Sequence, residues 1–243
     1  MLEAGWWGFV GGAALLVGSA LGLWLPVSTR VIGGVMAVGT GVLVSALTFE
    51  LTEEAYQRAG GLPAVLGLLA GSLVFFAGDW WIDHRGGSRR KSPTGQHQGG
   101  AGGTALALGA LLDGIPESAA IGVSLLGGGS VGIAVVAAVF LSNIPESMSS
   151  SAGMRKAGHS PRFILLMWLA VTVASAVAAA LGYALLGGAS ASVVAFIQTF
   201  AAGAILTMLA DTMVPEAVEH AGSLVGLLVV LGFVAAFLLS FAA

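Results

Sequence analysis

Hydrophobic residues in this chain fall into long runs separated by short polar stretches. A bilayer core requires about 20 apolar residues per helix. By that measure the chain holds eight candidate spans, at residues 5–25, 31–52, 62–82, 104–126, 129–152, 163–187, 191–214 and 222–243. The runs do not alternate between apolar and polar positions, which excludes the pattern of a membrane β-barrel. We therefore expect an all-α, polytopic integral membrane protein in which residues 1–243 form one domain of eight transmembrane helices.

The polar connections orient this predicted bundle. Residues 83–103 are rich in glycine, serine and basic side chains, a composition typical of a flexible loop. Of the nine Lys and Arg residues, only Arg58 falls on the opposite side from the rest. The positive-inside rule then makes the basic side cytoplasmic and places both termini outside it. The eight basic residues on the cytoplasmic side are Arg30, Arg85, Arg89, Arg90, Lys91, Arg155, Lys156 and Arg162.

Two internal similarities indicate an inverted repeat. Residues 41–60, GVLVSALTFELTEEAYQRAG, align without gaps to residues 203–222, GAILTMLADTMVPEAVEHAG. The second similarity is the tetrapeptide IPES, at 115–118 in the fourth span and at 144–147 in the fifth. In both cases the two spans are predicted to run in opposite directions. Inverted repeats are common in secondary transporters, whose substrate site lies near mid-membrane at the repeat interface.

The composition is consistent with a helical membrane protein and limits the kinds of metal ligand that the chain can provide. The chain is 57% hydrophobic and 9% charged, with a mean hydropathy of +0.96, and contains 38 glycines, which favour close packing of transmembrane helices. It contains no cysteine, which excludes disulfides and thiolate metal ligands. The start, MLEAGWWGF, lacks the basic region of a cleavable signal, so we expect the first span to be retained.

The fourth and fifth spans carry acids close to the predicted membrane centre. Asp113 and Glu117 are four residues apart and share a helix face, and Ser142 and Glu146 repeat that spacing, with Asn143 three residues before Glu146. A carboxylate at the centre of a membrane helix costs about 2.5 to 3.5 kcal/mol. No Lys, Arg or His occupies the central part of any span. We therefore expect the counter-charge to come from outside the sequence, as a metal ion or as protons.

A proline precedes the glutamate in each of these spans. Pro116 cannot donate a hydrogen bond to the carbonyl of Leu112, and Pro145 cannot donate one to that of Leu141. The freed carbonyls are hard oxygen donors of the kind that cations bind. The alternative is that the prolines only shape the helices, and that the acids are protonated and bonded to neighbouring serines.

These motifs resemble those of the ZIP (Zrt/Irt-like) family of divalent-metal transporters, and the resemblance spans almost the whole chain. The family's fourth-span motif, His-Asn-x-Pro-Glu-Gly, corresponds to residues 113–118, and its fifth-span motif, His or Gln-x-x-Pro-Glu-Gly, corresponds to residues 142–147. The resemblance implies that the metal is bound by Asp113, Glu117, Ser142 and Glu146. Asn143 completes the metal site that we predict.

The chain departs from the family pattern at the ligands themselves. The family's histidine is Asp113 here, the asparagine after it is Gly114, its fifth-span histidine or glutamine is Ser142, and both motif glycines are serines. An all-oxygen ligand set suits Mn²⁺, Mg²⁺ or Fe²⁺, while Zn²⁺ also accepts carboxylates. The sixth span contains no acid that could support a second metal, so we expect a single one.

The resemblance implies a transporter, not an enzyme, that moves a divalent cation toward the cytoplasm through the mid-membrane carboxylates. The expected partners are divalent cations and the bilayer, with no organic cofactor and no nucleic acid, and a homodimer is allowed. A short chain with sparse loops suits a bacterial inner membrane. Two alternatives stay open: an intramembrane hydrolase that activates water with one of the acids, and a ZIP homologue that binds metal without transporting it.

Other polar positions carry weaker expectations. The serines that follow Glu146, which are Ser147, Ser149, Ser150 and Ser151, could form a hydrated exit track or could simply smooth helix packing. Glu216 and His220 are four residues apart near the inner end of the seventh span. They could handle the metal on release or could be ordinary interfacial residues.

Overall fold

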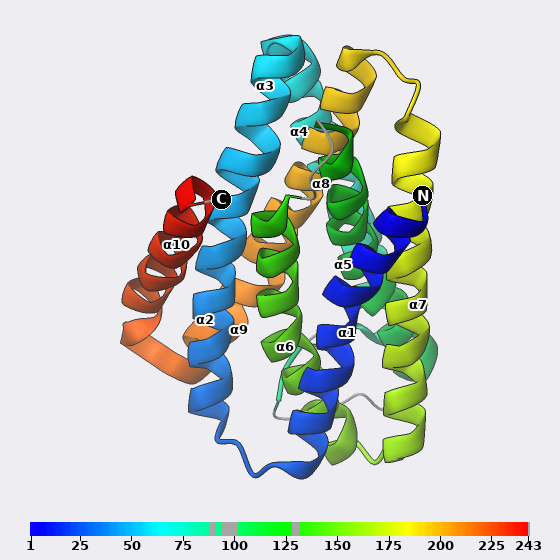
Figure 1. Ribbon diagram of the computed structural model, residues 1–243. Helices are drawn as coiled ribbons and strands as arrows, with labels where there is room; N and C mark the ends of the chain where they lie inside the picture. Colours follow the sequence, from blue (N-terminus) through cyan, green and yellow to red (C-terminus); the bar gives the residue numbers. More distant parts are fainter. Residues whose placement is uncertain (88–90, 94–101, 128–131, 243) are drawn as a thin grey trace.

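The computed structural model describes residues 1–87, 91–93, 102–127 and 132–242. Within these ranges every regular element is a helix, and no strand occurs. The helices form one elongated bundle (Figure 1). Their bounds are α1 Leu2–Trp24, α2 Thr29–Ala46, α3 Glu54–Ala59, α4 Gly61–Ile82, α5 Gly102–Ser124, α6 Ile133–Lys156, α7 Pro161–Leu186, α8 Ala191–Met208, α9 Val214–Ala221 and α10 Val225–Ala242.

Seven helical stretches of the described chain are long and apolar enough to cross a membrane. Six of these stretches each correspond to one predicted span. The seventh, Ala191–Ser240, contains α8, α9 and α10, and the chain reverses direction after α9, so that α10 runs back alongside α2 (Figure 1). The prediction of a helical membrane protein is therefore confirmed for the described residues.

Glycines allow the helices to touch backbone to backbone. A Cβ atom added at Gly18 of α1 would lie 2.1 Å from the carbonyl oxygen of Ile144 in α6. One added at Gly41 of α2 would lie 1.9 Å from the carbonyl oxygen of Val229 in α10. These separations leave room only for hydrogen, as expected where dispersion contacts hold helices together in lipid. The close packing predicted from the glycine content is found at both contacts.

The two segments that align in sequence also share a backbone feature. A π-helical turn follows α2 at Leu47–Glu53, and another follows α8 at Leu209–Met213. Leu47 and Leu209 occupy the same position of the alignment. Each segment then ends at a glycine with positive φ, 81° at Gly60 and 66° at Gly222, where a side chain would be strained.

A contact between a glutamate and a basic residue four positions later also occurs at aligned positions of the two segments. Glu54 of α3 pairs with Arg58, and Glu216 of α9 pairs with His220 at 3.1 Å. The two short helices lie toward opposite ends of the bundle (Figure 1). Glu216 is thus held by a neighbour on its own helix.

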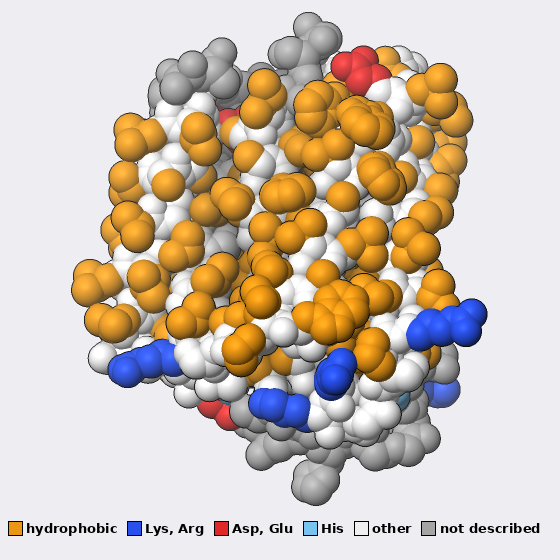
Figure 2. Space-filling view, turned by 60° about the horizontal axis from the view of Figure 1, so that its bottom comes forward, with side chains coloured by type: hydrophobic (Ala, Val, Ile, Leu, Met, Phe, Trp, Pro, Cys, Tyr) orange, Lys and Arg blue, Asp and Glu red, His pale blue; other side chains and the backbone are white. Residues whose placement is uncertain are grey.

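Basic side chains gather at one end of the molecule, which we call the basic end (Figure 2). It holds the α1–α2 and α6–α7 connections and the end of α4, while the α3–α4 connection with Arg58 lies at the other end (Figure 1). The predicted members Arg89 and Arg90 lie outside the described residues. The described residues at the basic end are Arg30, Arg85, Arg155, Lys156 and Arg162.

Candidate functional site

The site is built by α5 and α6, which run without interruption through Pro116 and Pro145. The two helices touch each other little, because α5 packs mainly on α7 and α8 and α6 mainly on α1 and α2. At 1.5 Å per residue, Asp113 lies about 16 Å along α5 from its start, and Glu146 lies about 15 Å along α6 from its end. Both carboxylates therefore sit near the middle of the bundle.

All five predicted ligands are buried. Their exposed fractions are 2% for Asp113, 1% for Glu117, 0% for Ser142, 3% for Asn143 and 2% for Glu146. No carboxylate of this set faces lipid, so the cost of burying three acids must be met by groups inside the protein.

Lys91 provides a positive charge at this point. Its Nζ lies 3.3 Å from Oδ2 of Asp113 and 3.3 Å from Oε1 of Glu146. Only 3% of Lys91 is exposed. One ammonium group thus joins the acids of α5 and α6 across the gap between the two helices.

The expectation that the counter-charge comes from outside the sequence was therefore wrong for this conformation. That expectation was based only on the residues of the predicted spans, whereas Lys91 reaches the site from the predicted loop 83–103. Parts of that loop lie outside the described residues. Among its described parts, Asp83–Gly87 continues α4 as a π-helical turn, and Lys91, Ser92 and Pro93 are buried in the bundle.

Residues 91–93, which we call segment 91–93, also contact α6 through side-chain hydrogen bonds to their backbone. The Ser149 hydroxyl donates a hydrogen bond to the carbonyl oxygen of Lys91. The Lys156 ammonium donates one to the carbonyl oxygen of Pro93, at 2.7 Å. Non-helical backbone at membrane depth requires such internal partners, because lipid offers none. Segment 91–93 therefore lies against the half of α6 nearer the basic end, and the Lys91 side chain reaches the carboxylates.

Glu117, one turn beyond Asp113, completes the charged cluster. Its carboxylate interacts electrostatically with Glu146, Lys91 and Asp113. Its Oε1 atom receives no hydrogen bond from the residues that the structure describes. We call the cluster of Asp113, Glu117, Glu146 and Lys91 the carboxylate site. Within it, Glu117 Oε1 is a buried acceptor available for a donor or a cation.

The two polar residues predicted beside Glu146 are used elsewhere. Ser142 Oγ donates to the carbonyl oxygen of Val139 in its own helix, at 3.0 Å. Asn143 Nδ2 donates to the carbonyl oxygen of Gly11 in α1 at 3.1 Å. In the described part of the chain, no group of three or more His, Asp or Glu side chains is arranged to hold a metal. The predicted ligand set is brought into one region but is not assembled around a common point.

Serine hydroxyls near the acids bond to backbone. Ser118 donates to the carbonyl oxygen of Gly114 at 2.6 Å, and Ser147 to that of Asn143 at 2.7 Å. Farther along α6, Ser151 donates to Ser19 of α1 at 3.0 Å and accepts from the Trp168 indole of α7 at 2.9 Å. Ser151 therefore links three helices, as the packing alternative requires.

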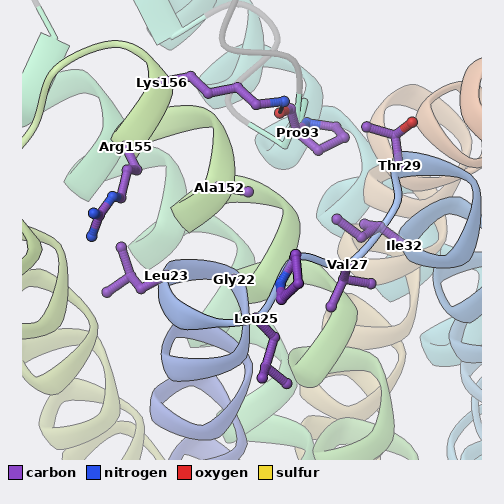
Figure 3. Close-up of a pocket in the computed structure, with 11 residues that line it drawn as sticks. Gly22, Leu23, Leu25, Val27, Thr29, Ile32, Pro93, Ala152, Arg155 and Lys156 are labelled. Carbon is purple, nitrogen blue, oxygen red and sulfur yellow. Dashed lines mark hydrogen bonds between the residues drawn. The ribbon is translucent and has the colours of Figure 1, made fainter.

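A cavity of about 270 Å³ lies beside segment 91–93 at the basic end. Its lining comes from the end of α1, the α1–α2 connection, the start of α2, the end of α6 and Pro93. Figure 3 shows the Lys156 side chain extending along this cavity to Pro93. Segment 91–93 thus borders open space on its basic-end side.

Sequence reasoning found the acids of the carboxylate site but missed Lys91. That lysine ends a basic run, RRK, in a stretch of glycine, serine and charge, which is the pattern of solvated chain. The SP dipeptide that follows it is equally uninformative. Comparison with known protein families gives no match for this chain, and comparison with curated proteins gives none.

Proposed function

We propose that the chain is a divalent-cation transporter of the ZIP type, in which the cation crosses the membrane through the carboxylate site. The observation that carries the proposal is the burial of Asp113, Glu117 and Glu146 around one ammonium group near mid-bundle. Intramembrane acids that face the protein interior and pair with a cation are typical of ion pathways. A site that already accommodates one cation between α5 and α6 has the chemistry to accept another.

The substrate that fits this site is a hard divalent ion. The available donors are carboxylate oxygens, hydroxyls and backbone carbonyls, which suit Mn²⁺, Mg²⁺ or Fe²⁺, and Zn²⁺ is also compatible with carboxylates. Three carboxylates balanced by one lysine carry a net charge of −2 when all are ionised. A divalent cation in place of the lysine would neutralise two of the three carboxylate charges, whereas the lysine neutralises one.

The architecture that we propose has eight spans and an inverted repeat. The reversal of the chain between α9 and α10 supports counting Ala191–Ser240 as two spans. The π-turns at aligned positions, the two glycines of positive φ and the two glutamate pairs support the repeat. In repeat-built transporters one group of helices moves against another around a central site. Here α5 and α6 would carry the ion past the remaining helices, toward the basic end.

Uptake into proteoliposomes tests the proposal. Purified protein is reconstituted, and the entry of Mn²⁺, Zn²⁺, Fe²⁺ and Mg²⁺ is compared with that into empty liposomes. We expect uptake by the wild type, and loss of most of it in Glu117→Gln and Glu146→Gln, which keep the side-chain shape but remove the charge. Glu53→Gln is the matched control, because Glu53 is exposed and accepts a hydrogen bond from Gln57 of the next turn. Uptake that is equal in all four proteins would remove the carboxylate site from the pathway.

A further inference from the structure

We propose that Lys91 is a tethered competitor of the transported cation: its ammonium occupies the carboxylate site, and the cation must displace segment 91–93 to bind. This inference rests on the proposed function, since it identifies what closes the same site from the basic end. It assigns a role to a loop residue that neither sequence motif includes.

The ammonium stands where a transported cation would be held. It is within 3.3 Å of one carboxylate oxygen from α5 and one from α6, so it draws on the acids of both helices. Asp113 and Glu146 cannot each give that oxygen to a metal ion and to Lys91 at the same distance. A metal ion that takes the place of the ammonium between these two acids therefore excludes the pairing of Lys91 with them.

The remaining contacts of segment 91–93 are suited to release. The Ser149 hydroxyl and the Lys156 ammonium each donate a hydrogen bond to its backbone. Both donors lie on α6 between Glu146 and the basic end. The cavity that borders Pro93 lies on the same side. Residues 91–93 are not helical, so their displacement toward the basic end would break no helical turn within the segment.

Charge determines which cations can compete. A monovalent ion would exchange one positive charge for another and would gain no electrostatic advantage over the tethered ammonium. A divalent ion would bring two charges to three carboxylates and would leave the Lys91 ammonium free to move toward water at the basic end. Lys91 is thus a specificity-determining residue that favours divalent over monovalent cations.

The absence of cysteine from the chain makes displacement directly measurable. Ser92 is 1% exposed, so in Ser92→Cys a membrane-impermeant maleimide should label the thiol slowly. We expect Mn²⁺ to raise the labelling rate at least about tenfold, because the segment leaves when the ion binds. Ala157→Cys, at an exposed position on the same end, is the matched control and should label at the same rate with or without Mn²⁺.

Uptake measurements give an independent readout. If segment 91–93 is in place in nine molecules of ten, removing it lowers the half-saturating cation concentration by about tenfold. We expect that decrease in Lys91→Gln and no such decrease in Lys91→Arg, which keeps the charge. Arg30→Gln removes an exposed basic residue of the same end and serves as the control. Should Lys91→Gln fold poorly, Ser149→Ala keeps the ammonium, weakens the anchor and should shift the concentration in the same direction.

The outcomes separate this inference from the proposed function. Suppose that the wild type takes up Mn²⁺, that Mn²⁺ does not change the labelling rate of Ser92→Cys, and that Lys91→Gln does not change the half-saturating concentration. The competitor role is then overturned, while the proposed transport function is retained. If Lys91→Gln abolishes uptake while Lys91→Arg restores it, Lys91 is a required part of the site and not a competitor. If the wild type takes up no divalent cation, the proposed function fails and the inference fails with it.

Discussion

At the scale of single residues, the negative charge of the acids in α5 and α6 is partly balanced by a positive charge inside the protein. Asp113 and Glu146 share one ammonium group, and Glu117 lies within the same electrostatic environment. Removing one partner would leave an uncompensated buried charge, which is strongly destabilising. Pairing with the two carboxylates therefore stabilises Lys91 in its buried position. The polar neighbours Ser142 and Asn143 have partners in the backbone instead.

Asn143 should therefore stabilise the bundle and not bind the cation. Its side-chain amide links α6 to the Gly11 carbonyl of α1, and hydrogen bonds between membrane helices contribute about 0.6 to 2 kcal/mol. We expect Asn143→Ala to lower the free energy of unfolding in detergent by that amount. Ser142→Ala, which removes a bond within one helix, should cost less. An unchanged stability together with a tenfold weaker cation affinity would instead assign Asn143 to the ligands.

At the scale of elements, glycines determine how closely the helices around the site approach. α1 lies against α6 beside the fifth-span IPES motif, because Gly18 presents no side chain to Ile144 and Ser147. A Cβ at Gly18 would meet the Ile144 carbonyl at 2.1 Å and the Ser147 hydroxyl at 2.2 Å. The position of α6, and with it that of Glu146, depends on this contact.

Gly18→Ala should destabilise the protein by about 1 to 3 kcal/mol, because overpacking forces the two backbones apart. Gly226→Ala in α10 is the matched control, since nothing lies within 4 Å of its added Cβ. The measurement is thermal unfolding of both variants in the same detergent. Equal melting temperatures for the two variants would show that α1 and α6 are not in the close contact described.

The elements themselves could be largely predicted from the sequence, because long apolar runs in lipid can only be helices. The predicted second span, 31–52, ends too early, since the helix continues through a π-turn to Ala59. Segment 91–93 could not be predicted, because its burial results from a pairing between Lys91 and residues far along the chain. Hydropathy reports the local preference of a segment, not such a tertiary contact.

At the scale of the whole molecule, the described Lys and Arg side chains other than Arg58 and Lys91 mark one end of the bundle (Figure 2). Both chain termini lie in the half of the molecule away from that end (Figure 1). The positive-inside rule then predicts a cytoplasmic basic end and extracytoplasmic termini. Transport toward the basic end would be uptake into the cell.

Single-cysteine variants test this orientation in intact cells. We expect Gln57→Cys, on α3 at the end opposite the basic end, to react with an impermeant maleimide added outside. Ala157→Cys should react only after the membrane is made permeable. The wild type, without cysteine, gives the background. The reverse pattern of labelling would invert the direction that we propose for transport.

The central claim is that the acids of α5 and α6 hold the cation in transit. Anomalous diffraction from crystals soaked in Mn²⁺ tests it most directly, because the ion's position is read without reference to activity. We predict one anomalous peak among Asp113, Glu117 and Glu146, with the Lys91 ammonium moved away from Asp113 and Glu146. A Mn²⁺ peak found only elsewhere, with the two Lys91 ion pairs intact, would contradict it.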